Sequence, residues 1–289
     1  MAYRQTGIRY AISDMLKVRL VTDSTCDLPP DLVLRYGILV VPAVLNMEGK
    51  SYRDGVDISR ADYYARLPGL KALPTTAAPA AGEFEAVYRE CGDAEVVSIH
   101  LASQLSAMFN TARLGAEASG ARVTLVDSGN VSMALGWQVL AAAEAVAAGK
   151  PLAEVAAAVE STRKRVKLFA LLDTIEFLRR GGRASAFAAT VGELLQIKPM
   201  LEVAEGSLIQ LAKPRTHGKG VEKLVELVQA LGPLERLAVM YATTPVEAKS
   251  LADRLAPLSP RPPLVVEATT VIGTHAGPGA LGVAAVKAM

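Results

Sequence analysis

Short apolar runs alternate with longer mixed stretches along the first half of the chain. The apolar runs end in polar residues or glycine, as buried strands do, and they span residues 18–22, 38–45, 95–100 and 122–127. Stretches with helical spacing lie between them, at 29–36, 59–67, 82–90 and 106–118. This alternation of strand and helix favours a parallel sheet with helices on its faces.

The second half of the chain changes character. Residues 131–150 form an Ala-rich stretch with few polar groups, which predicts a helix packed inside the core, and 151–164 predicts the helix that leaves the first unit. From residue 167 onward the pattern predicts a smaller α+β sheet. Its expected elements are strands at 168–172, 237–242 and 264–267, helices at 174–180, 219–230 and after Thr244-Pro245, and a hairpin of 198–203 with 207–211.

These elements predict an α/β protein of two domains. The first, residues 1–165, is a Rossmann-like parallel-sheet domain, and the second, residues 166–289, is a smaller α+β domain with its ligand site between the two. The first strand begins near Val18, so residues 1–14 are interpreted as a candidate extension upstream of Met15. The sequence leaves Met1 and Met15 open as the true start.

Composition narrows the classes of function. A chain of 289 residues with 51% hydrophobic content can bury a large core, and a formal charge of +2 gives no argument for nucleic acid. The longest uncharged run, residues 128–143, is shorter than the roughly 20 apolar residues of a membrane span. The N-terminus lacks the apolar core of a signal peptide, so we expect a cytoplasmic protein with no integral membrane segment. Three histidines without ligand spacing argue against a structural metal.

Three distant loops carry the candidate chemistry. They are LPTTAAP (73–79), IHLASQLSAMFNTA (99–112) and VIGTHAGPGALG (271–282), each with hydroxyl or imidazole side chains. Ser106 stands at the start of an apparent helix, and Thr75 and Thr76 precede another helix start. Hydroxyl and backbone N–H groups at such positions can hold an anion, although from the residues alone ordinary helix capping is the default interpretation. His275 stands in a glycine-rich loop, where it is either a ligand contact or a structural histidine.

Together with further segments, these loops resemble the DegV family, bacterial proteins that bind one fatty acid and present its carboxylate. The further segments follow the family's pattern in order, and they are VTDSTCDLP (21–29), VVPAVLNMEGKSYRDGVDIS (40–59), LVDSGNVSMALGW (125–137), IEFLRRGGRAS (175–185) and IKPML (197–201). The resemblance covers residues 18–287, nearly the whole chain.

The resemblance implies a single long-chain fatty acid as the ligand, with no metal or other cofactor. It assigns the carboxylate to Thr76 and Ser106 of the first domain and to His275 of the second. A secondary set on the same segments would support the head group: Thr75, Ser103, Ala107 and Thr274. The chain departs from the usual pattern beside Ser106, where Ala102 replaces a serine and Ala107-Met108-Phe109 replaces Gly-Thr-Tyr. The helix predicted at 131–150 also has an alternative role: instead of only packing in the core, its Ala and Met side could line the tunnel for the fatty acid.

The resemblance also implies a role and a partner. In this family, the bound fatty acid is phosphorylated by a fatty acid kinase, and the acyl phosphate is carried toward phospholipid synthesis. Basic residues near the loops of the second domain are implicated in docking that kinase, and here the candidates are Arg183 and Arg215. The protein itself would be a carrier without catalytic activity of its own.

Two other functions compete with the carrier. Ser106, His275 and an acid such as Asp23 or Asp127 could form the triad of a serine-dependent esterase, although no GxSxG elbow follows a strand. A nucleotide-binding protein is the second rival. Gly-Lys-Gly at 218–220 lacks the P-loop frame, and GTHAGPG does not follow the order of a dinucleotide fingerprint.

Overall fold

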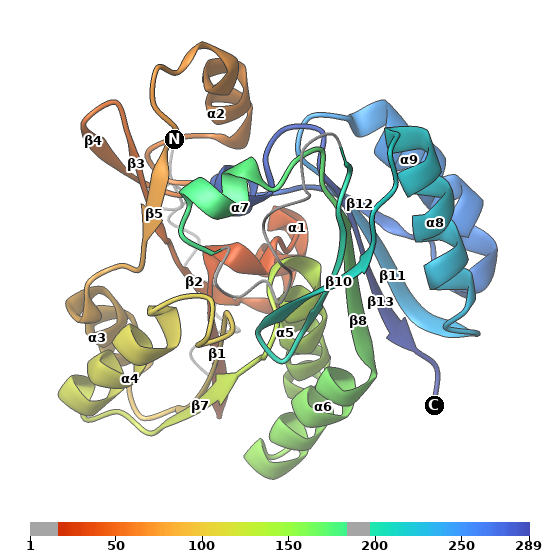
Figure 1. Ribbon diagram of the computed structural model, residues 1–289. Coiled ribbons are helices and arrows are strands. Elements are labelled where there is room, and N and C mark those ends of the chain that lie inside the picture. Colours follow the sequence, from red (N-terminus) through yellow and green to blue (C-terminus); the bar gives the residue numbers. More distant parts are fainter. Residues whose placement is uncertain (1–16, 184–196) are drawn as a thin grey trace.

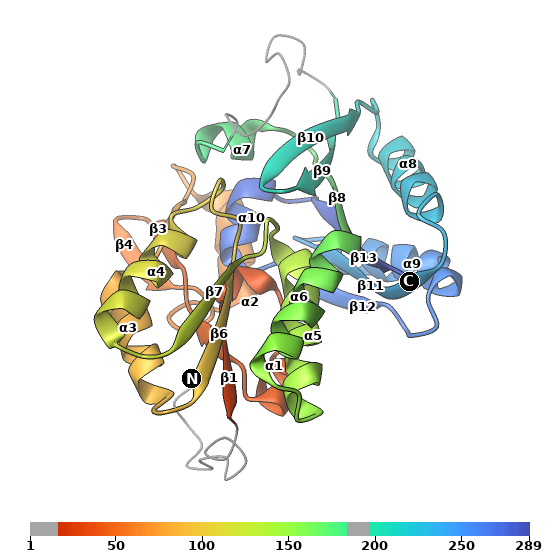
Figure 2. The ribbon, with the colours of Figure 1, turned by 90° about the horizontal axis from the view of Figure 1, so that it is seen from below.

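A parallel sheet forms the centre of the N-terminal half in the computed structural model, which describes residues 17–183 and 197–289. Its strands are β1 (Val18–Asp23), β2 (Leu39–Val41), β6 (Glu95–His100) and β7 (Val123–Asp127), in the order β2-β1-β6-β7. Helices α3 (Ala81–Glu90) and α4 (Met108–Ser119) cover one face, and α1 (Pro30–Tyr36) and α5 (Ser132–Ala147) cover the other (Figure 2). The predicted parallel-sheet region is thereby confirmed. The expectation for residues 1–14 lies outside the described residues.

The apolar run at 38–45 is two strands rather than the single strand expected. Pro42 has no backbone N–H to give to a ladder, so β2 stops at Val41 and β3 (Val44–Met47) starts in another sheet. There β3 pairs antiparallel with β4 (Lys50–Arg53) and β5 (Thr75–Ala77), while α2 (Arg60–Arg66) follows β4. The strand β5 carries Thr76, which the sequence had placed in a loop.

The second sheet has six strands, in the order β10-β9-β8-β13-β11-β12. Their bounds are β8 Val166–Leu171, β9 Met200–Ala204, β10 Ser207–Ala212, β11 Leu234–Tyr241, β12 Leu264–Glu267 and β13 Leu281–Lys287. The strand β13 was not predicted, yet it lies in the middle, antiparallel to both β8 and β11. Helices α8 (His217–Gln229) and α9 (Pro245–Leu255) pack against this sheet on the side away from the first one (Figure 1).

One helix, α5, joins the two sheets. It contacts β1 and β6 of the first sheet and β8 and β13 of the second, and the Trp137 indole donates to the Ala284 carbonyl at 3.0 Å. Ala134, Leu135 and Val139 are fully buried. The prediction of a core helix is confirmed, because a helix between two sheets needs apolar or small side chains all round. The next helix, α6 (Leu152–Arg165), leads from α5 into β8.

The segment around His275 is a helix and not the loop expected. It is α10 (Thr270–Ala276), which ends where Gly277 adopts a φ of 79°. Although α10 belongs to the C-terminal half of the chain, it contacts α2, β3 and β5 of the N-terminal half, and also α7 (Glu176–Arg180). The division of the chain at residue 165 therefore stays a prediction. Within the described ranges, no helix combines the length and the apolar character required to cross a membrane.

Candidate ligand cavity

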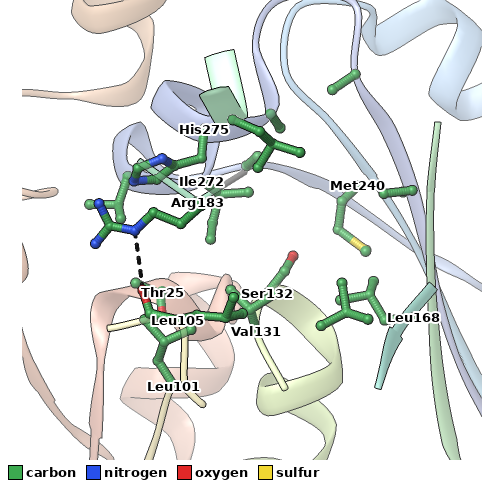
Figure 3. A pocket seen from close by; sticks show the side chains of 18 of the residues that line it. Thr25, Leu101, Leu105, Val131, Ser132, Leu168, Arg183, Met240, Ile272 and His275 are labelled. Carbon is green, nitrogen blue, oxygen red and sulfur yellow. Dashed lines mark hydrogen bonds between the residues drawn. The ribbon is translucent and has the colours of Figure 1, made fainter. Parts of the chain in front are cut away.

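A cavity of about 160 Å³ lies between the two sheets. Its wall is mostly apolar and includes Leu101, Leu105, Leu168, Leu201, Met240 and Ile272. The polar lining residues are Thr25, Thr76, Ser106, Ser132, Arg183, Tyr241 and His275. Figure 3 shows His275 and Arg183 at one end of the cavity, and Leu168 and Met240 at the other. The cavity thus has charged and imidazole side chains at one end (the polar end) and aliphatic side chains at the other (the apolar end).

His275 joins the two halves of the molecule at the polar end. Its Nε2 lies 2.7 Å from the Thr76 hydroxyl, a contact that spans 199 residues of sequence. Its Nδ1 is buried and has no hydrogen-bond partner among the described residues. Burial, and then the positive charge of Arg183, lower the pKa of His275 to about 4. The imidazole is therefore neutral at physiological pH, and it can donate through only one of its nitrogens.

Gly181 makes room for that imidazole. A Cβ at this position would overlap the His275 Nδ1 and would lie 2.7 Å from its Cε1. Gly181 is also the C-cap residue of α7. Any larger residue at this position would push the ring away from Thr76.

Ser106 reaches the cavity from the loop between β6 and α4. The helix begins at Met108, two residues later than expected, and the Ser106 hydroxyl accepts the Met108 N–H at 3.2 Å. Since this bond uses only an oxygen lone pair, the hydroxyl proton can still be donated into the cavity.

Arg183 lies in the cavity wall rather than on an outer loop. Its Nε donates to the Leu105 carbonyl at 3.2 Å, and its Nη1 donates to the Gly181 carbonyl at 2.7 Å (Figure 3 shows the first bond). Partial burial lowers the pKa of Arg183 from a very high ordinary value, so the guanidinium stays charged. Arg215, the other candidate for docking, is exposed between β10 and α8 and does not line the cavity.

The four secondary residues lie outside the cavity lining. Thr75, Ser103 and Ala107 are exposed. Thr274 is buried within α10, where its hydroxyl donates to the Thr270 carbonyl at 2.7 Å and lies 2.9 Å from the Tyr63 hydroxyl. These contacts stabilise α10, and Thr274 does not line the cavity.

Three polar lining residues were missed by the sequence reasoning: Thr25, Ser132 and Tyr241. The first two stand in segments that the family resemblance had already marked, beside Asp23 and in the stretch that follows β7. The Thr25 hydroxyl donates to Asp23, and the Ser132 hydroxyl donates to Asp27. The available signal was the Asp-Ser pair that ends each of β1 and β7, at residues 23–24 and 127–128.

Neither acid proposed for an esterase triad reaches His275. Asp23 is fully buried and accepts from His100 Nδ1 at 3.0 Å and from the Leu101 N–H at 3.1 Å. Asp127 accepts backbone N–H groups of Ser103 and Gly129, at 3.2 and 2.9 Å. His100 does contact a serine, Ser98, at 2.6 Å, but both are fully buried and no substrate can approach them.

Comparisons with known proteins place these features in a family. The model of the DegV family, described as uncharacterised protein, matches residues 17–288. A DegV domain-containing protein of Deinococcus radiodurans is 33% identical over 287 residues, which covers 93% of this chain and 98% of that protein. Another, from Streptomyces coelicolor, is 36% identical over 273 residues, which covers 92% of this chain and 97% of that protein.

Two solved structures are similar over nearly their whole length. A DegV family protein from Thermus thermophilus, described for its fatty acid binding, has a TM-score of 0.86 and 33% identity, with 94% of this chain and 99% of that chain covered. DegV from Bacillus subtilis, described as a fatty acid binding protein, has a TM-score of 0.84 and 29% identity, with 93% and 99% covered.

Proposed function

The chain belongs to the DegV family, and on that premise we propose that it binds one long-chain fatty acid in the cavity between its sheets. The observation that carries the proposal is the cavity itself, whose wall is mostly apolar and which has His275 and Arg183 together at one end. Fatty acid binding by the similar proteins from Thermus thermophilus and Bacillus subtilis supports the choice of ligand.

The carboxylate would lie at the end formed by Thr76, Ser106 and His275. Hydroxyl groups and a neutral imidazole donate hydrogen bonds without adding fixed charge, and Arg183 supplies one positive charge at the same end. This arrangement suits a single anion that must leave water, because the anion is both hydrogen-bonded and partly compensated in charge.

The tail and the head group would contribute differently to binding. Transferring about 15 methylenes from water at ~0.8 kcal/mol each gives roughly 12 kcal/mol of gross burial energy. A hydrogen bond to a charged group contributes about 1.5–3 kcal/mol. The tail therefore determines affinity, while the polar end determines which way round the ligand lies.

The direct test extracts the natively purified protein with organic solvent and identifies the bound lipid by mass spectrometry. Delipidated protein is then titrated with palmitate and methyl palmitate, which share a tail but differ in head-group charge. We expect Thr76→Val and Ser106→Ala each to lower the affinity for palmitate about 10-fold and to change the affinity for methyl palmitate by no more than about twofold. Thr75→Val is the matched control, because Thr75 is exposed on the same strand. No affinity of the parent protein for any C14–C18 acid would overturn the proposal.

We further propose that the cytoplasmic protein is a carrier with no catalysis of its own. It would present the carboxylate to a fatty acid kinase, and the acyl phosphate would feed phospholipid synthesis. The position of Arg215, exposed outside the cavity, suits kinase docking, whereas Arg183 would act on the head group as well. The assay pairs fatty-acid binding with acyl phosphate formation by the kinase. Arg215→Ala should keep binding and lose most phosphorylation, and Arg183→Ala should lower both. Parallel loss of binding and phosphorylation in Arg215→Ala would contradict the docking role.

A further inference from the structure

Two buried carboxylates hold the N-terminus of α10 from the other half of the chain. Asp27 Oδ1 accepts the Thr269 N–H at 2.8 Å, across 242 residues of sequence. Asp54 Oδ1 accepts the Thr270 N–H at 3.2 Å and the Thr270 hydroxyl at 2.8 Å, across 216 residues. Both carboxylates are almost completely inaccessible to solvent. Neither Asp27 nor Asp54 is among the residues that line the cavity, although Thr25, from the same segment as Asp27, is.

These carboxylates replace the local cap that α10 lacks. Thr269 is the N-cap residue, but its side chain makes no capping bond. The first N–H groups of a helix have no partner within the helix and carry partial positive charge, so buried carboxylates are favourable there. Burial raises the pKa of both carboxyl groups above the usual value, and the positive charge of Arg60 opposes that rise. Arg60 also donates to the Glu267 carbonyl just before the helix.

Further contacts fix how α10 is rotated and how far it is inserted. The Tyr64 hydroxyl donates to the Ala268 carbonyl at 3.1 Å, and Gly273 packs so closely that a Cβ there would lie 2.8 Å from Tyr64 Cζ. Figure 2 shows α10 near the centre of the molecule, between the two sheets. At the far end, His275 follows Thr270 by five residues, a rise of about 7.5 Å along a helix. A shift or rotation at the carboxylate end is therefore transmitted directly to the imidazole.

We propose that Asp27 and Asp54 are positioning residues which set the place of the His275 imidazole at the polar end of the cavity, and so determine how strongly a carboxylate is preferred over an uncharged head group. The inference rests on the proposed function for its ligand, but its geometric part concerns the protein alone. It gives Asp27 and Asp54 one shared role. Neither carboxylate lines the cavity. Asp54 therefore acts on the ligand through α10, whereas Asp27 also accepts a hydrogen bond from the hydroxyl of Ser132 in the cavity wall.

The experiment compares Asp54→Asn with the parent protein, using palmitate and methyl palmitate on delipidated samples. The amide keeps the shape and an acceptor oxygen but removes the charge. We expect the palmitate-to-ester affinity ratio to fall at least fivefold while ester affinity stays within twofold. Asp57→Asn is the matched control, because Asp57 lies three residues away, pairs with Arg53 at 2.8 Å on the surface, and does not contact α10. An equal loss of affinity for both ligands, or an unchanged palmitate-to-ester affinity ratio, would overturn the proposal.

A second readout needs no ligand. The ring signals of His275 are assigned by ¹⁵N NMR through comparison with His275→Gln, and they should move in Asp54→Asn but not in Asp57→Asn. If the parent protein binds neither lipid, the proposed function fails, and the NMR comparison alone tests the positioning role. His275 ring signals that do not move in Asp54→Asn would refute that role. If Asp54→Asn does not fold, Thr270→Val removes one of the two bonds to Asp54 with little change in shape. It should then lower the affinity ratio about threefold, and an unchanged ratio would refute the role.

Discussion

Replacing Gly181 by alanine tests whether the imidazole is held where the cavity needs it. Gly181 has φ −73° and ψ −1°, a conformation open to any residue, so the added methyl group acts through its volume alone. That methyl would overlap His275 Nδ1 and would lie 2.7 Å from Cε1 and 3.0 Å from the Phe177 carbonyl oxygen. Restoring ordinary contacts requires the ring or the turn to move by about 1 Å, since carbon atoms pack at roughly 3.5–4.0 Å.

Overpacking of this kind costs about 1–3 kcal/mol. A ring moved by ~1 Å also loses its 2.7 Å contact with Thr76, worth about 0.5–1.5 kcal/mol. We therefore expect Gly181→Ala to lower the free energy of unfolding by about 1–3 kcal/mol and the palmitate-to-ester affinity ratio about 3- to 10-fold. Chemical denaturation measures the first quantity, and lipid titration measures the second.

Two comparisons isolate the cause. Gly82→Ala is the control, because Gly82 lies in α3 with open space at its Cβ, and alanine there should be neutral or stabilising by up to about 1 kcal/mol. In a His275→Ala background the clash with the ring disappears and only the 3.0 Å approach to the Phe177 carbonyl oxygen remains, so Gly181→Ala should then cost much less, as a double-mutant cycle would show. An equal cost in both backgrounds would refute the steric explanation.

Two further predictions follow from the cavity. Because the folded pKa of His275 is about 4, below its unfolded value of 6.5, the unfolded state binds the proton first. The ligand-free protein should therefore lose up to about 3 kcal/mol of its free energy of unfolding through His275 as pH falls from about 6.5 to 4. Denaturation curves at several pH values should show a weaker pH dependence for His275→Gln, and the same dependence in both proteins would contradict a buried neutral ring. Leu168→Phe, at the apolar end, should shift binding from C18 toward C14 acids several-fold while keeping the preference for carboxylate over ester; an unchanged chain-length preference would place the tail elsewhere.

Periodicity in the sequence was sufficient wherever a segment is governed by its own neighbours. The strand 95–100 was predicted at the bounds it has in the structure, and the hairpin around residues 204–206 was recognised from its turn. The core helix α5 was recognised because a segment with almost no charge cannot lie on a surface. The resemblance of ordered segments to the DegV family was likewise available from the sequence, and the comparisons confirm it.

The sequence failed where long-range contacts override local preference. β13 was missed because its apolar run follows a glycine-rich segment, and only its position between β8 and β11 makes it a central strand. His275 was assigned to a loop because glycines surround it, whereas Asp27, Asp54 and Tyr64 stabilise a helix there from more than 200 residues away.

The sequence by itself thus determined the fold class, the family and the three segments that approach the polar end of the cavity. Only the tertiary structure decided that Arg183 lies in the cavity wall while Arg215 stays exposed, and that Thr76, rather than an acid, contacts the histidine. The physical reason is that hydrophobic pattern specifies which face of an element is buried, but not which partner it meets. Partners are selected by the packing of residues distant in sequence, and the chemistry of this site depends on those partners.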